Sequence, residues 1–167
     1  MNTRQLDINT PKGQETLKQE RDAIRAFCSQ HKSLGWISTM KDEPATVDGL
    51  FYLQRDSTLY SIVEVKCRNM TKKKLSGDYK WEWLISADKV KRAKRLAECL
   101  SASFVGFLHL VPDKLLLVKQ VTDRKGEWVD GEPRYEVTTT QATVNGGIAE
   151  RENAFINMEQ AREYKIQ

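Results

Sequence analysis

The residues with the clearest chemical potential are Asp48 and the tripeptide Glu64-Val65-Lys66. Side chains alternate along an extended strand, so Glu64 and Lys66 are expected on one face and Val65 on the opposite face. Apolar residues lead directly into this charged pair. A charged side chain at the end of a hydrophobic strand is unfavourable unless it is paired, hydrated or bound to a metal ion. If the strands carrying Asp48 and Glu64 pair as a hairpin, the two carboxylates converge near one end of a sheet.

Two carboxylates a few ångströms apart repel each other and take up a proton unless a cation lies between them. Oxygen ligands of this kind suit Mg²⁺, or Mn²⁺ as a substitute, because these ions keep several waters and accept phosphate oxygens. A nearby lysine can orient an attacking water, help to remove its proton, or neutralise charge on a phosphate. Asp48, Glu64 and Lys66 therefore indicate phosphodiester hydrolysis, and Gly49 leaves room for a close approach. The alternative is an interstrand Glu64–Lys66 ion pair with an unrelated Asp48.

The elements expected around these residues are those of an α/β domain built on one mixed sheet. Helical spacing of apolar residues, with Ser86 as a cap, and β-branched runs bounded by turn residues predict these elements. The expected helices are 13–30, 87–100 and 158–164, and the expected strands are 35–40, 46–53, 59–67, 102–111, 114–121 and 135–144. Residues 69–78 indicate a basic loop, and residues 145–147 indicate a turn.

In this order of elements the chain resembles the PD-(D/E)xK nuclease superfamily, which includes archaeal Holliday-junction resolvases and many phage nucleases. The resemblance covers about residues 13–121 and rests on Asp48-Gly49 and Glu64-Val65-Lys66 in successive strands. Lys12-Gly13 followed by Glu20-Arg21 resembles the N-terminal signature of the resolvases. Val47 stands where a proline often precedes the first acid, a position that shapes the backbone and supplies no ligand. The implied fold is a restriction-endonuclease-like core, a central mixed sheet flanked by helices in the order αβββαββ.

The resemblance also implies a role for each residue of the set. Asp48 and Glu64 would be metal ligands, and the carbonyl of Val65 would be a third ligand. Lys66 would be the catalytic lysine, and the cofactor would be Mg²⁺ with Mn²⁺ as a substitute.

A further acid of the family pattern comes from the first helix. Glu20 would approach the metal, directly or through water, because it falls on the inward-facing apolar stripe of residues 17–24. Glu15 is the second candidate, since the position of the helix acid varies within the family. The alternative for Glu20 is a helix-surface pair with Arg21 or Arg25.

Positive charge is concentrated in residues 66–95, which carry eleven Lys or Arg and three acids, a net charge of +8. The rest of the chain has a net charge of −4. A basic segment in an otherwise acidic domain is typical of a surface that binds polyanions such as DNA, although a solvated helix face and lysine loop would look the same. The expected phosphate contacts are Lys72, Lys73, Lys74, Lys89, Lys91, Lys94 and Arg95.

Length and composition exclude several classes of protein. The chain of 167 residues predicts a single domain, with a core at about 13–121 and an extension at 122–167. No apolar run is long enough to span a membrane, and the three cysteines suit a reducing cytoplasm. The compact single-domain build would suit a phage or mobile element. The function expected is a Mg²⁺-dependent DNA endonuclease, structure-specific or not, and a homodimer would allow both strands to be cut. The alternative is an inactive DNA-binding or regulatory module on the same fold, and RNA or free DNA ends are further candidate substrates.

Overall fold

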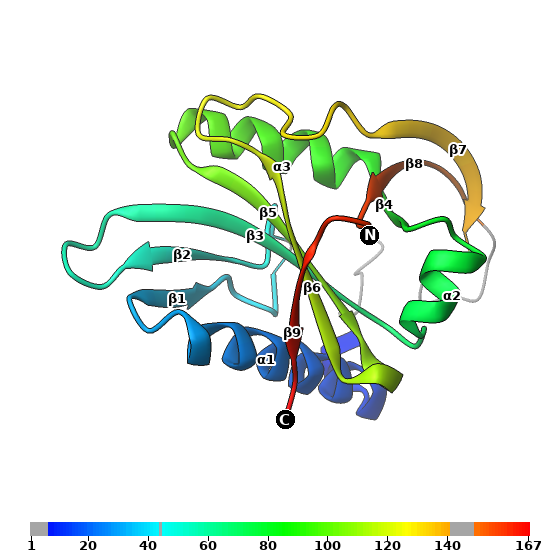
Figure 1. Cartoon of the computed structure of the whole chain (residues 1–167), viewed down its shortest axis with the longest axis horizontal. Coiled ribbons are helices and arrows are strands. Elements are labelled where there is room, and N and C mark those ends of the chain that lie inside the picture. The colour runs from blue at the N-terminus through cyan, green and yellow to red at the C-terminus, as the bar shows by residue number, and fades with distance from the viewer. Residues whose placement is uncertain (1–6, 44, 141–148) are drawn as a thin grey trace.

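The computed structural model describes residues 7–43, 45–140 and 149–167, which form an α/β structure with a curled, mixed sheet (Figure 1). The helices are η1 (Asp7–Asn9), α1 (Pro11–Gln30), α2 (Lys72–Gly77), α3 (Ala87–Cys99) and η2 (Val111–Asp113). The strands are β1 (Leu34–Ser38), β2 (Gly49–Leu53), β3 (Leu59–Arg68), β4 (Glu82–Ser86), β5 (Ser103–Leu110), β6 (Leu115–Thr122), β7 (Arg134–Thr140), β8 (Ala149–Asn157) and β9 (Arg162–Lys165). The predicted α/β class with a mixed sheet is confirmed.

The main sheet has six strands in the order β1-β2-β3-β5-β6-β9. Only β3 and β5 are parallel, with Glu64 beside Gly106, and the other neighbours are antiparallel. A parallel pair needs a crossover connection, and here the crossover contains α2, β4 and α3. A second sheet of three strands, in the order β4-β8-β7, joins this crossover to the C-terminal part of the chain.

The two faces of the main sheet bury separate apolar cores because neighbouring side chains of each strand point in opposite directions. On one face, Ile24 and Phe27 of α1 pack against Val63 and Val65 of β3. On the other face, α3 and the second sheet pack against Ile62. Figure 1 shows α1 and α3 on opposite sides of the sheet. No helix among the described residues is long and apolar enough to cross a lipid bilayer.

Helix α1 begins where the sequence supplies a cap. The Thr10 hydroxyl accepts a hydrogen bond from the backbone N–H of Gly13 at 3.0 Å, and Pro11 occupies the first turn, where a missing N–H does no harm. Further along, Ala23, Ile24 and Phe27 are buried against the sheet. This apolar stripe fixes the rotation of α1 about its axis. It therefore also fixes the direction of the side chains in the helical turn that precedes the stripe.

Two predictions about local structure need correction. The basic loop at 69–78 contains α2, because Thr71 caps a short lysine-rich helix and Leu75 anchors it in the core. The closing helix at 158–164 is wrong: the chain turns after Met158 and continues as β9, whose backbone pairs with β6. So short a helix would be marginal on its own, whereas a sheet edge satisfies its backbone groups. The turn expected at 145–147 lies outside the described residues.

Candidate functional site

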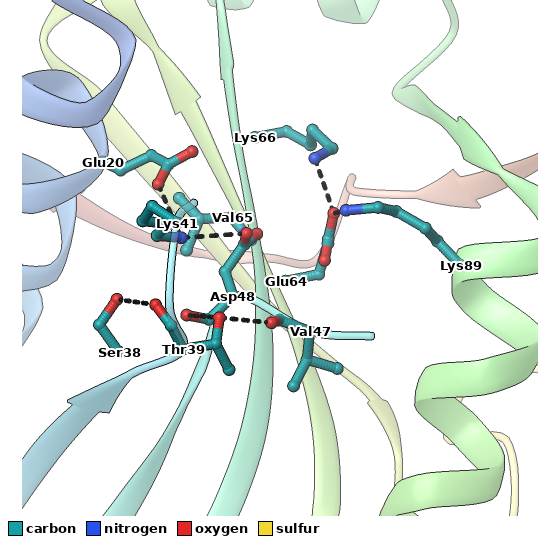
Figure 2. Close-up of polar contacts among 10 residues, drawn as sticks. All are labelled: Glu20, Ser38, Thr39, Lys41, Val47, Asp48, Glu64, Val65, Lys66 and Lys89. Atoms are coloured by element: carbon teal, nitrogen blue, oxygen red, sulfur yellow. Dashed lines mark hydrogen bonds and ion pairs between the residues drawn. The ribbon is translucent and has the colours of Figure 1, made fainter. Parts of the chain in front are cut away.

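Asp48 lies immediately before β2 rather than within a strand over 46–53, and the backbone around it is firmly held. The Thr39 hydroxyl lies 2.8 Å from the carbonyl oxygen of Val47 and 2.9 Å from that of Asp48, while the Asp48 N–H donates to the Val63 carbonyl at 2.9 Å. The carboxylate accepts a hydrogen bond at Oδ2 from the backbone N–H of Val65 at 2.7 Å. Asp48 is therefore fixed against β3 at the point where β2 begins (Figure 2).

Glu64 is the most deeply buried acid of the site, with a side chain only 1% exposed. Its Oε1 lies 2.6 Å from Lys66 Nζ and 2.6 Å from Lys89 Nζ. Its Oε2 is buried and has no hydrogen-bond partner among the described residues. The contact between Glu64 and Lys66 confirms that they share a face of β3, while Val65 packs in the core on the other face. Lys89, at the start of α3, was expected as a phosphate contact, and its ammonium contacts Glu64 directly.

Glu20 also reaches the site, through a residue that sequence reasoning missed. Lys41 Nζ lies 3.2 Å from Glu20 Oε2 and 3.2 Å from Asp48 Oδ1, so that its ammonium links α1 to the start of β2. The Glu20 side chain is 18% exposed, and no pair with Arg21 or Arg25 forms. Lys41 lies in an irregular segment without periodicity, and nothing in its sequence context distinguishes it from other lysines.

The second candidate for the helix acid lies elsewhere on α1. Glu15 is exposed and accepts a hydrogen bond from the Gln19 side chain at 3.3 Å. It makes no ion pair with any described residue. The structure therefore brings Glu20, and not Glu15, to Asp48.

The six charged groups form one cluster of three carboxylates and three ammonium groups, drawn in Figure 2: Glu20, Asp48, Glu64, Lys41, Lys66 and Lys89. Burial opposes the charge of Asp48, but Lys66, Lys41, Lys89 and the Val65 N–H together hold its pKa below the ordinary value. Burial likewise opposes the charge of Lys66, but Glu64 and Asp48 raise its pKa, so that it is a cation at neutral pH. Burial and the neighbouring Asp48 raise the pKa of Glu20 in spite of Lys41.

The oxygen atoms at this site suit a hard divalent cation. Glu64 Oε2 is a buried carboxylate oxygen without a hydrogen-bond partner in the described part of the chain, and Asp48 approaches the same strand one residue further along. The N–H and C=O of one strand residue point to the same side, so the Val65 carbonyl faces the side from which Asp48 approaches. The described residues contain no cluster of three or more His, Cys, Asp or Glu arranged for a metal ion. A bound Mg²⁺ would therefore depend on two carboxylates, a carbonyl, water and substrate oxygens, as this ion often does.

The other basic residues expected to contact DNA lie on two separate elements. On α3, Lys91 pairs with Glu152 at 2.8 Å, and Lys94 pairs with Glu98 at 3.8 Å. Arg95 is exposed and makes no ion pair with a described residue. On α2, Lys72 pairs with Glu163 at 2.6 Å, and Lys74 lies 5.9 Å from the ring of Tyr79. Lys73, also on α2, is exposed and makes no ion pair within the described part of the chain.

Two cavities meet at Asp48 and Lys41, which line both of them. On the side of α1 is a pocket of about 280 Å³ with a largely apolar wall. On the side of α3 is a groove of about 840 Å³ between residues 39–43, the start of α3, and β8. Five basic residues line this groove, Lys41, Lys89, Lys91, Arg92 and Arg151, together with five acidic residues, Asp42, Glu43, Asp48, Asp88 and Glu152. Of the described residues, none on α2 lines either cavity, and the contribution of Arg92 and Arg151 was not anticipated from the sequence.

Taken together, these contacts give a buried Glu64 carboxylate beside two lysine cations, the partly exposed Asp48 carboxylate fixed against the same strand, and an adjoining groove lined by both basic and acidic side chains. No protein-family model matches the chain, and no curated protein or solved structure is significantly similar to it.

Proposed function

We propose that this protein is a Mg²⁺-dependent DNA nuclease that hydrolyses phosphodiester bonds at Asp48, Glu64 and Lys66. The observation that carries the proposal is the state of Glu64: the carboxylate is buried, two ammonium groups share Oε1, and Oε2 has no partner among the described residues. An unsatisfied buried carboxylate oxygen is unfavourable in a structural ion pair. It is what a site that receives a cation requires.

The order of elements supports a restriction-endonuclease-like core. With α2 and β4 treated as insertions in the crossover, the chain runs α1, β1, β2, β3, α3, β5 and β6, which is the expected αβββαββ order. Asp48 lies at the start of the second strand, and Glu64-Val65-Lys66 lies within the third. This is where the PD-(D/E)xK pattern has its functional residues.

In this mechanism the chain's own residues hold and orient the reacting groups. Asp48, Glu64 and the Val65 carbonyl would hold Mg²⁺, which would supply Lewis-acid polarisation of a phosphate oxygen. Lys66 would stabilise the negative charge that develops on the phosphate as water attacks. Lys89 contacts and orients Glu64 from α3, and Glu20 contacts Lys41 of the same site from α1. Because these groups come from three elements packed against one strand, little reorganisation is needed at the moment of reaction.

The groove on the side of α3 provides a path for the DNA backbone. Lys91 and Arg92 are balanced by Glu152 and Asp88, whereas Arg151 of β8 makes no ion pair with a described residue. Phosphates could replace the acidic partners of these exposed side chains at little expense, because exposed ion pairs are weak. The lysines of α2 would extend this surface beyond the groove.

A second candidate, a non-catalytic DNA-binding module, has one observation in its favour. The three lysines of the cluster already balance the three carboxylates, so the site is electrically neutral without a metal. In such a module DNA would bind to the same groove through its Lys and Arg side chains, and no bond would be cleaved.

Cleavage of supercoiled plasmid with Mg²⁺, and with EDTA in place of Mg²⁺, separates the two functions. We expect nicking by the wild type with Mg²⁺ only, and loss of nicking in Asp48→Asn, Glu64→Gln and Lys66→Met, with DNA binding retained. Asp56→Asn and Glu163→Gln, which change exposed acids outside the cluster, should cleave normally. Cleavage by Asp48→Asn and Glu64→Gln at the wild-type rate would refute the site, and DNA binding without any cleavage would favour the non-catalytic module.

A further inference from the structure

The pocket beside α1 is distinct from the groove that would hold the DNA backbone. Its wall is formed by Leu17 and Ile24 of α1, Trp36 of β1 and Val65 of β3. Asp48 and Lys41 stand at its opening, where the pocket meets the groove. A cavity of about 280 Å³ with an apolar wall and a few polar groups at its mouth is the usual form of a small-molecule subsite.

Trp36 gives this pocket an aromatic surface next to the reacting centre. Its indole packs on Phe51 with the ring centroids 4.8 Å apart and extends over Gly49. A Cβ atom at Gly49 would collide with the indole, so glycine after Asp48 is what allows the ring to come this close. Trp36 is only half-buried, so part of its surface is open to a ligand.

The position of the pocket identifies its ligand. In any nucleic acid, the group attached through the sugar to a phosphate is a planar base with an aromatic face and a polar edge. A phosphate at Asp48 therefore places the adjacent base within reach of the pocket, because Asp48 stands at the opening of the pocket. Bases stack favourably on aromatic side chains, and Glu20 and Lys41 offer an acceptor and a donor for the polar edge of the base.

We propose that this pocket binds one unpaired base next to the scissile phosphate, an inference that rests on the proposed nuclease function. A base in the pocket cannot remain paired and stacked in a duplex, so it must be extruded or already unpaired. Extrusion is least costly at a bulge, flap, junction or mismatch. The substrate class of the enzyme is therefore DNA with an unpaired base at the cleavage site.

Binding of DNA that contains 2-aminopurine tests this proposal. The probe is a duplex with 2-aminopurine in a single-base bulge, compared with the fully paired duplex, in EDTA so that no cleavage occurs. We expect the wild type to bind the bulged duplex about tenfold more tightly, which is typical of stacking one base on an aromatic ring. Stacking on Trp36 should also quench the 2-aminopurine fluorescence.

Two variants probe the pocket from different sides. Leu17→Phe fills it from α1 without removing any contact of the sheet, and Trp36→Leu removes the aromatic surface. Both should lose the preference for the bulge, while Ile37→Phe, on the exposed face of β1, should keep it. Equal affinity of the wild type for the two duplexes, or a preference that survives Leu17→Phe, would overturn the base pocket. Metal-dependent plasmid nicking by the same preparations reports separately on the nuclease function, because nicking without a bulge preference refutes only the pocket.

Discussion

At the scale of single residues, Glu64 is the least satisfied charged group of the site. A carboxylate that is 1% exposed, with one oxygen unpartnered among the described residues, gains less from folding than a fully bonded one would. Such a group contributes poorly to stability, even with Lys66 and Lys89 beside it. Its position is better explained by a ligand that it binds than by the fold that surrounds it.

The Lys41 ammonium lies between the carboxylates of Glu20 and Asp48, where a divalent cation could take its place. In Lys41→Met the two carboxylates lose their shared counter-charge, so the free energy of unfolding in EDTA should fall by about 1–3 kcal/mol. Mg²⁺ should restore part of this loss, because a divalent cation can replace the ammonium. Urea unfolding in EDTA and in Mg²⁺ measures both effects.

The control for this variant is Lys32→Met, which removes an exposed lysine at the end of α1 and should change neither value. If Lys41→Met were as stable as the wild type in EDTA, or if Mg²⁺ stabilised both chains equally, the bridging role of Lys41 would be wrong.

The chemistry of individual residues could be predicted only where it follows from local geometry. Strand alternation is enough to place Glu64 and Lys66 on one face, and hairpin pairing is enough to bring Asp48 to β3. Lys41 depends instead on how an irregular segment crosses from β1 to the start of β2, which no periodic pattern encodes. The choice of Glu20 over Glu15 likewise depends on the packed orientation of α1.

At the scale of elements, α1 must be held in register with the sheet for Glu20 to reach Asp48. His109 of β5 makes one such contact: its Nδ1 lies 3.2 Å from the Gln19 carbonyl oxygen, which can only accept, so Nδ1 carries the hydrogen. Burial lowers the pKa of His109 in spite of this hydrogen bond and the nearby Asp22. The folded chain therefore takes up a proton at His109 less readily than the unfolded chain does.

This difference predicts how stability depends on pH. Below the unfolded-state pKa of about 6.5, the unfolded chain binds a proton at His109 that the folded chain does not, so stability falls as the pH falls. The fall attributable to His109 is at most about 1.4 kcal/mol per pH unit and ends at the lower pKa of the folded state. His109→Gln keeps a donor for the carbonyl but cannot titrate, so it should lose less stability between pH 7 and pH 5. Urea unfolding across this range checks the difference.

His31→Gln is the matched control, because it retains His109 and should keep this part of the pH dependence. Identical pH slopes for the wild type and His109→Gln would show that His109 takes up a proton equally in both states.

The second sheet supplies a wall of the groove, and this assignment can be tested by salt dependence. Arg92 of α3 and Arg151 of β8 line the groove, so replacing both with alanine should remove two phosphate contacts. The logarithm of the binding constant for duplex DNA, plotted against the logarithm of the salt concentration, should then have a slope that is shallower by about 2 units, at about 0.9 per contact. The Lys72, Lys73 and Lys74 triple alanine variant should flatten it by less than its three charges imply, since α2 does not line the groove.

If the Arg92 and Arg151 double variant left the slope unchanged, and the α2 triple variant flattened it by the full amount for three contacts, the DNA would follow α2 and not the groove. Folding should be preserved in both variants, because exposed charged side chains contribute little to stability.

The elements up to β6 were predictable except for α2 and β4, and those beyond β6 were poorly predictable. α1, α3 and β3 carry long, strongly patterned apolar runs that determine their type. β8 is polar at its exposed positions, and it forms a strand because it pairs on both sides, with β4 and β7. β9 has four residues and pairs along Leu115–Val118 of β6, so its strand conformation depends on a distant partner.

At the scale of the whole molecule, the site lies where the two cores of the curled sheet meet. Glu20 and Lys41 approach Asp48 from the side of α1, while Glu64, Lys66 and Lys89 form the contacts on the side of α3 (Figure 2). Each face has its own cavity, and among the residues that the structure describes only Asp48 and Lys41 line both. Under the proposed nuclease function, this arrangement would give one phosphodiester centre two neighbouring subsites, one for the DNA backbone and one for a base.

The central claim is that Asp48 and Glu64 form a divalent-cation site. The most direct measurement is a titration of the chain with Mn²⁺, in which the free ion is followed by electron paramagnetic resonance. The wild type and Glu163→Gln should each bind one Mn²⁺ in a saturable manner, and Mg²⁺ should compete for the site. Glu64→Gln should lose that binding, because it removes the charge of the buried ligand while preserving its shape. Equal Mn²⁺ binding by the wild type and Glu64→Gln, or no saturable binding by the wild type, would contradict the metal site.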